Sequence, residues 1–275
     1  MAGDISITAR SRRPAEDILE AAVTRPRVRT ELILSVASPL LVLVLWEVLV
    51  RSGTLNALFF PPPTFVFKTM YTMTLSGELP HQVGVSLRRV LLGFGLGAAP
   101  AVIIGLAMGW SSRVRAFVEP IIAATYPVPK IALLPMIMLI FGIGEMSKIV
   151  IIAVGAFFPA AINATAAVLG ISPTYFEVAR NFGAGPYRTF TRVVLPGSLP
   201  IVFAGLRLGV GVALLLVVAA EFVAAREGVG ALIWLAWQTL RTEKLYAGVV
   251  TWAAIGVLST RGLQWLERRI VRWAR

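Results

Sequence analysis

The sequence predicts an all-α integral membrane protein with six transmembrane helices, and three observations lead to this fold class. Hydrophobic residues make up 57% of the 275 residues and charged residues only 15%, whereas soluble domains carry roughly 25% charge. Mean hydropathy is +0.80. Six segments are apolar over the length of about 20 residues that a spanning helix needs, and basic residues bracket them.

The predicted spans follow one another along the chain with short polar connections. They are residues 32–50, 85–109, 116–141, 147–170, 197–222 and 245–266. Spacings such as Gly93 to Gly97 and Gly205 to Gly209 favour close helix contacts in a membrane. Proline residues interrupt the backbone hydrogen bonding of several spans, as at Pro127, which neighbouring protein can compensate. We expect a tightly packed and kinked bundle.

Charge placement predicts the topology. Residues 1–30 form a basic tail that contains Arg10, Arg12 and Arg13 and lacks the apolar region of a signal peptide. Basic residues also follow the last span. Positive charge favours the cytoplasmic side, and six crossings return the chain to the side where it began. We therefore expect two cytoplasmic termini and a single transmembrane domain at 31–275, and the net charge of +12 does not indicate nucleic-acid binding.

Little catalytic chemistry is available to the chain. It has no cysteine and one histidine, His81, so thiolate or histidine-based metal sites and catalytic triads are not expected. The segments GFGLGAAP at 93 and GIGEMSK at 142 contain glycines, but neither follows a strand of a βαβ unit, and the second lacks the phosphate-loop ending. We expect no catalytic residue, no metal and no nucleotide bound by this chain.

One polar segment, residues 171–196, separates the fourth and fifth spans and falls on the cytoplasmic side of the predicted topology. Within it, EVARNFGAGPYRTFTRVVLP begins at position 177. Ser172 and Pro173 predict the start of a helix that ends at Gly183, and Pro186 predicts a second short helix that ends before Pro196. Large apolar side chains in this segment, such as that of Phe182, indicate a surface that a partner protein covers.

This segment resembles the EAA motif of the permease subunits of binding-protein-dependent ABC importers, whose form is E-A-A, three residues, G, nine residues, I-x-L-P. Glu177-Val178-Ala179, Gly183 and Val193-Val194-Leu195-Pro196 match it without a gap, with valine in place of one alanine and of the isoleucine. The resemblance extends from about residue 60 to the end. Its segments SLRRVLLGFGLG at 86, YPVPKIALLPMIMLIFGIGEMSK at 126, LPGSLPIVFAGLRLG at 195 and AEFVAAREGVGALI at 220 look like the nitrate, taurine and aliphatic sulfonate branch. That branch also contains permeases for other small compounds.

The resemblance implies a type I ABC importer permease fold and a non-catalytic subunit of the bacterial inner membrane. It implies a homodimer that works with two ATP-binding subunits, which use ATP and Mg, and with an extracytoplasmic solute-binding protein. The helix of the motif would be the coupling helix, seated in a groove of the ATPase. The residues implied in ATPase coupling are Glu177, Ala179, Gly183, Ala184, Tyr187, Leu195 and Pro196.

Other polar residues are candidates for the solute path or the outer face. Tyr126, Asn163 and Glu221 are candidates for the path, although Asn163 could equally bond between helices and Glu221 could pair with Arg226. The candidates for contact with the binding protein are Arg88, Arg226 and Arg241. With Arg89, they are expected on the outer face, where some of them contact the binding protein or attract an anionic solute, or instead pair with Glu78, Glu227 and Glu243.

Two other classes of function remain open at this stage. A channel or secondary transporter also fits six spans, but it should carry paired charges or broken helices deep in the membrane instead of a docking motif. A membrane-embedded enzyme would need clustered acidic or histidine residues.

Overall fold

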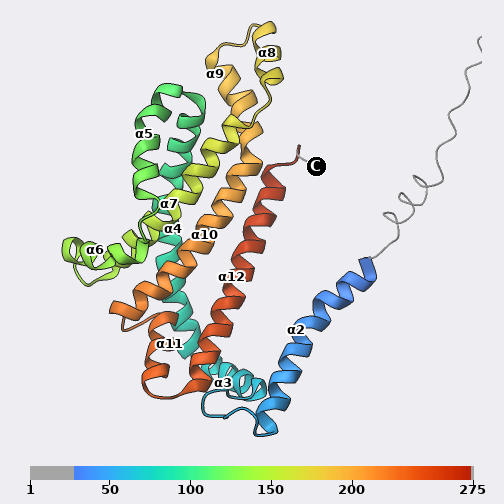
Figure 1. Cartoon of the computed structure of the whole chain (residues 1–275), viewed down its shortest axis with the longest axis vertical. Coiled ribbons are helices and arrows are strands. Elements are labelled where there is room, and N and C mark those ends of the chain that lie inside the picture. The colour runs from blue at the N-terminus through green and yellow to red at the C-terminus, as the bar shows by residue number, and fades with distance from the viewer. Residues whose placement is uncertain (1–27, 274–275) are drawn as a thin grey trace, which may run out of the picture. The chain divides into compact units, whose positions relative to one another are not determined.

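The computed structural model describes residues 28–273, and within them all regular secondary structure is helical (Figure 1). Residues 1–27, which make up most of the expected basic tail, lie outside the described residues. The chain divides into two compact units, the first ending at Ala57 and the second running from Leu58 to Arg275. In the first unit, α2 (Val28–Arg51) contains the predicted span 32–50.

The second unit holds the other helices, which follow the order that the hydrophobic pattern predicts. They are α3 (Pro63–Leu75), α4 (Glu78–Trp110), α5 (Ser112–Thr125), the 3₁₀ helix η1 (Lys130–Leu133), α6 (Leu134–Phe141), α7 (Glu145–Leu169), α8 (Pro173–Asn181), α9 (Pro186–Thr189), the π-helical turn η2 (Phe190–Val194), α10 (Leu195–Ala224), α11 (Val229–Gln238) and α12 (Thr242–Ile270). Figure 1 places α8 and α9 at one end of α10, and α11 at the other.

Helices α4, α7 and α10 form the centre of this unit, and α7 packs against the other two. Glycines make the contact possible. A Cβ atom at Gly97 of α4 would lie 2.1 Å from the carbonyl oxygen of Ala153, and one at Gly205 of α10 would lie 2.5 Å from the Cβ atom of Asn163. The predicted close packing at these glycines is confirmed, since no larger residue fits between the helices.

Among the described residues, three helical stretches are long and apolar enough to cross a membrane: α4, α7 and the continuous stretch Pro186–Ala224. A fourth span results if α5 and the η1–α6 segment, bent by 88° relative to α5, are counted together. The predicted span 116–141 is therefore not one straight helix, and the interruption that the sequence predicts at Pro127 is found there. The break falls at Pro127 and Pro129, which have no N–H group to donate to a continuing helix.

One detail predicted for the 171–196 segment is wrong. Pro196 does not stop the second short helix, because the π-helical turn η2 leads directly into α10, with Leu195 N–H donating to the carbonyl of Phe190. This wider turn shifts the hydrogen-bond register just where Pro196 lacks an N–H group. The predicted start of the first short helix is confirmed, since Ser172 is the N-cap residue of α8 and Pro173 is its first residue, although the Ser172 side chain makes no hydrogen bond to the helix end.

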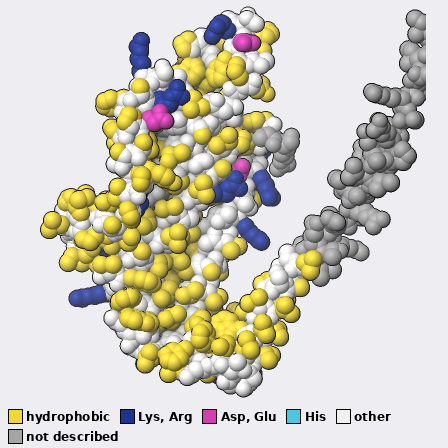
Figure 2. All heavy atoms as spheres, viewed as in Figure 1, with side chains coloured by type: hydrophobic (Ala, Val, Ile, Leu, Met, Phe, Trp, Pro, Cys, Tyr) yellow, Lys and Arg dark blue, Asp and Glu magenta, His cyan; other side chains and the backbone are white. Residues whose placement is uncertain are grey.

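Hydrophobic side chains cover most of the face seen in Figure 2 and gather densely over α6. Leu139 of α6 is 87% exposed, and Ile143, just beyond its end, is 75% exposed. Such surfaces are normal for a protein solvated by lipid or covered by another chain.

Candidate functional site

The 171–196 loop is built from two short helices joined at a glycine. Helix α8 ends in a Schellman motif, in which Ala184 N–H donates to the carbonyl of Ala179 and Gly183 N–H donates to that of Arg180, both at 2.9 Å. Gly183 has φ +69°, a left-handed conformation that glycine adopts without steric cost. The sharp turn between α8 and α9 therefore depends on this glycine.

The base of the loop is anchored to the helical core. Val194 is fully buried in a hydrophobic cluster formed by α4, α7 and α10. The ring of Phe190 packs edge-on against Trp110 at the end of α4, with ring centroids 5.7 Å apart. From the other end of the chain, Trp273 Nε1 donates to the carbonyl of Pro196 at 3.2 Å. These contacts hold the loop as a rigid extension of the long helices.

The tip of the loop presents aromatic side chains to the outside. Phe182 is 87% exposed and Tyr187 is 80% exposed. Within residues 28–273, no carboxylate forms an ion pair with Arg180 or Arg188, which flank these rings. Exposed aromatic groups among unpaired basic groups are typical of a surface that contacts another protein.

The structure places the predicted coupling residues on different sides of this loop. Glu177, Gly183, Tyr187 and Leu195 are exposed, Ala184 and Pro196 are half-buried, and Ala179 is buried. Ala179 thus belongs to the part of α8 that supports the loop, while the exposed residues are free to meet a partner. Their role in ATPase coupling stays a prediction.

A buried ionic cluster lies at the opposite end of α10. Arg89 Nη1 donates to Glu221 Oε1 at 2.6 Å, and Arg89 Nε donates to Glu145 Oε2 at 2.8 Å. Arg89, Glu221 and the nearby Lys148 are each no more than 4% exposed. Two buried cations, Arg89 and Lys148, thus lie near the buried Glu221 and the partly exposed Glu145, which is 43% exposed and pairs with both.

The same cluster fixes the loop between α10 and α11. The Glu221 carboxylate accepts hydrogen bonds from Ser86 Oγ and from Gly230 N–H, both at 2.8 Å. Ser86 Oγ in turn accepts from Val229 N–H at 2.8 Å, and Gln82 Oε1 accepts from Gly228 N–H at 2.6 Å. Side chains of α4 thereby satisfy the free N–H groups at the start of α11.

The three candidates for the solute path lie in different environments. Tyr126 is 56% exposed at the break after α5. Asn163 Nδ2 donates to the carbonyl of Pro159 in its own helix at 2.8 Å. Glu221 is enclosed in the ionic cluster and is bonded to Arg89, not to Arg226. The structure therefore does not bring the three together within one protomer, and their part in transport stays a prediction.

The outer arginines also differ in their surroundings. Arg88 Nη2 lies 3.2 Å from Glu145 Oε2 and is 63% exposed. Arg226 and Arg241 are exposed, and neither forms an ion pair with a described carboxylate. Of the carboxylates considered as alternative partners, Glu78 pairs with Lys244, at 2.8 Å. Contact with a binding protein stays a prediction for all three arginines.

Sequence reasoning placed Arg89 on the outer face without its partners Glu221 and Glu145, and it did not single out Ser86 or Lys130 as site residues. A signal for the cluster exists, because Gln82, Ser86 and Arg89 follow the i, i+4, i+7 spacing that places polar groups on one face of an apolar helix. Adjacent positions differ by about 100° around the axis, so Arg89 is buried while Arg88 is exposed.

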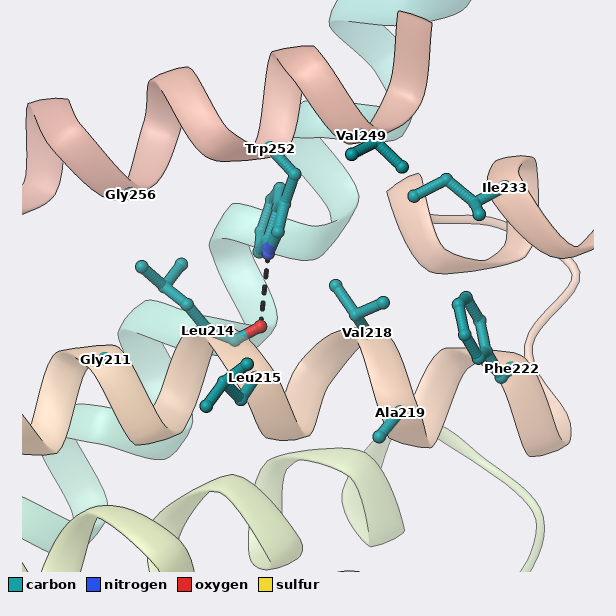
Figure 3. Close-up of a pocket in the computed structure, with 10 residues that line it drawn as sticks. All are labelled: Gly211, Leu214, Leu215, Val218, Ala219, Phe222, Ile233, Val249, Trp252 and Gly256. Carbon is teal, nitrogen blue, oxygen red and sulfur yellow. Dashed lines mark hydrogen bonds between the residues drawn. The ribbon is translucent and has the colours of Figure 1, made fainter. Parts of the chain in front are cut away.

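A separate hollow of 490 Å³ lies between α10, α11 and α12 (Figure 3). Trp252 Nε1 donates to the carbonyl of Leu214 across it at 3.1 Å. The side chains that Figure 3 draws around it are otherwise hydrocarbon, so this hollow does not suit a charged solute, which requires placed polar groups.

Comparison with known proteins identifies relatives over most of the chain. A family model described as "Binding-protein-dependent transport system inner membrane component" matches residues 91–272. A putative aliphatic sulfonates transport permease protein of Bacillus subtilis is 36% identical, over 86% of this chain and 85% of the relative. The taurine transport system permease protein of Escherichia coli is 34% identical, over 87% of this chain and 89% of the relative. The nitrate import permease protein of a Synechocystis strain is 26% identical, over 95% of this chain and 94% of the relative.

Proposed function

This chain belongs to the family of binding-protein-dependent transport system inner membrane components, and we propose that it is the permease subunit of an ATP-driven importer for a small sulfonate, taurine, nitrate or a similar compound. The solute class rests on the names of relatives that match most of the chain. A lower identity to the nitrate permease than to the sulfonate and taurine permeases favours the sulfur-containing solutes.

The proposed assembly contains two copies of this chain, two ATPase subunits that hydrolyse ATP with Mg, and an extracytoplasmic solute-binding protein. The observation that carries it is the 171–196 loop, whose rigid base supports exposed rings at Phe182 and Tyr187. A loop exposed only to water has no reason to present such rings. An ATPase groove that takes up the tip of the loop explains both the rigidity and the exposure.

The proposed topology has six spans, with α2 first, the bent α5–α6 segment third and α12 last. At 1.5 Å per residue, the 29 residues of α12 rise about 43 Å, more than the roughly 30 Å of a hydrocarbon core. An even number of spans puts both termini on the cytoplasmic side with the 171–196 loop, and the ionic cluster on the outer side.

In the proposed mechanism, α10 transmits the movement of the 171–196 loop across the membrane. The helix is continuous over the 39 residues Pro186–Ala224, about 58 Å at the α-helical rise, from the loop to the cluster at Glu221. Because the loop is fixed to this helix, closure of the ATPase dimer moves the whole helix as a rigid body, which biases the permease between inward- and outward-facing states.

Reconstitution tests the proposed function. The chain is co-expressed with a candidate ATPase subunit and solute-binding protein from the same genome, and uptake of labelled taurine, methanesulfonate and nitrate into liposomes is measured with and without ATP. We expect co-purification of the ATPase and uptake that requires both ATP and the binding protein. Uptake that persists without the ATPase would support a channel or secondary transporter and contradict the proposal.

A further inference from the structure

The break between α5 and α6 carries a positive charge deep in a predicted span. Helix α5 starts at the end of the molecule that holds α8 and α9 (Figure 1), and its 14 residues rise about 21 Å. Lys130 follows at the first position of η1. Its side chain therefore lies well inside the roughly 30 Å of a hydrocarbon core.

The ammonium group of Lys130 binds the backbone of the break. Its Nζ atom donates to the carbonyls of Thr125 at 3.0 Å, Tyr126 at 2.8 Å and Val128 at 2.8 Å. The end of α5 leaves the Tyr126 carbonyl without an acceptor role in the helix, whereas the Thr125 carbonyl also accepts from Val128 N–H at 3.2 Å. Three donors meet three acceptors, so the hydrogen-bonding capacity of the group is used up.

The charge of Lys130, in contrast, has no anionic partner in the described part of the chain. Its Nζ atom lies 4.1 Å from the ring centroid of Phe158 and 5.7 Å from that of Tyr126, and no described carboxylate forms an ion pair with it. The other cations in the spans differ, since Arg89 and Arg207 both pair with glutamates. The three bonds cap the end of α5 and fix the position of the ammonium group, and its charge still has no carboxylate to neutralise it within a span.

We propose that Lys130 determines the solute specificity of the path, as the positive charge that attracts a small anion such as a sulfonate to the break beside Tyr126. The inference rests on the proposed function. Because all three N–H groups are bonded to the backbone, the residue acts through its field and not through a direct hydrogen bond in this conformation.

The test uses charged thiol reagents, which is convenient because the chain has no cysteine of its own. A Tyr126→Cys variant is reconstituted with its ATPase, and its rates of reaction with 2-sulfonatoethyl and 2-(trimethylammonio)ethyl methanethiosulfonate are measured by mass spectrometry of the permease. The first reagent itself carries a sulfonate. We expect the ratio of the sulfonate rate to the ammonium rate to exceed that of a free thiol in solution.

Removal of the Lys130 charge should then remove this preference for the sulfonate reagent. Adding Lys130→Gln, which keeps two donors for the carbonyls, should lower the ratio about tenfold, since a unit charge about 6 Å away changes each rate by about threefold in water. Lys130→Arg should preserve the ratio. Lys68→Gln, which removes the same charge from exposed α3, is the matched control and should leave it unchanged.

Two results would overturn the inference. Tyr126→Cys that reacts with neither reagent means that water and solutes do not reach the break. A ratio at or below that of the free thiol, with Lys130 in place, means that its charge does not select anions, and this result does not depend on whether the glutamine variant folds. The thiol reaction rates do not depend on transport. A failure of this inference can therefore be distinguished from a failure of ATP-driven uptake, which tests the proposed function.

Discussion

Arg89 on α4 and Glu221 on α10 form an ion pair of 2.6 Å in which both side chains are almost completely buried, at 3% and 0% exposed. The pair joins two long helices at the end of the molecule opposite the 171–196 loop (Figure 1). Through Ser86 and Gly230, the same carboxylate also holds the start of α11. Four elements at this end are thus fixed by one small group of charges, with α7 joined through Glu145.

Loss of one partner should destabilise this end strongly. Arg89→Met leaves Glu221 as a buried, unpaired charge, and breaking such a pair costs about 3–5 kcal/mol. We expect a correspondingly lower free energy of unfolding for the purified protein in detergent. The double variant Arg89→Met/Glu221→Met should lose less than the sum of the two single variants, and strict additivity would mean that the two groups do not interact.

Gly228 should tolerate no other residue. It has φ +116°, and a Cβ atom there would lie 2.3 Å from Glu221 Oε1. Gly228→Ala should therefore cost about 2–4 kcal/mol from backbone strain and overlap, measured as the free energy of unfolding. Gly95→Ala is the matched control, because no atom lies within 4 Å of its added Cβ; it should be neutral or stabilise the helix slightly. Equal effects at both positions would refute this account.

The sequence predicts the helices well and the ionic cluster poorly, for a physical reason. Long apolar runs, such as 197–222 within α10, determine a spanning helix locally. The partner of a buried charge is set by tertiary packing, so the sequence suggested Arg226 for Glu221 by proximity, whereas the structure selects Arg89, which is 132 positions away. Only the polar stripe on α4 carries information on this contact.

The bend in the third predicted span has a similar origin. Pro127 and Pro129 predict an interruption, but no local rule gives its angle of 88° or the position of Lys130 over the Phe158 ring, since both depend on packing against α7. In the 171–196 loop, by contrast, Gly183 determines the turn through its own backbone, and the predicted end of the helix is confirmed by its φ angle.

The ring of Phe182 should contribute to binding of the ATPase. Because it is 87% exposed, Phe182→Ala removes few contacts within the permease, and stability should change by less than about 0.5 kcal/mol. Association with the ATPase should weaken by about 2 kcal/mol, or roughly 30-fold, if the ring fills a pocket in the partner. Titration of the ATPase into the permease in detergent measures this affinity.

The control is Phe117→Ala on α5, where the ring is 76% exposed; this variant should bind the ATPase normally. Equal binding by both variants would argue against docking through Phe182.

Gly183 should be required for coupling more than for folding. Its φ of +69° and the empty space around its Cβ position mean that Gly183→Ala adds only strain, about 1–2 kcal/mol, whereas Gly183→Arg adds the same strain together with a long charged side chain facing the partner. We therefore expect both variants to insert and to unfold at similar denaturant concentrations. Only the arginine variant should lose ATPase activity stimulated by loaded binding protein, and Glu177→Ala should lower that activity less. A Gly183→Arg complex that retains its ATPase and transports at the parent rate would show that the 171–196 loop is not the coupling element.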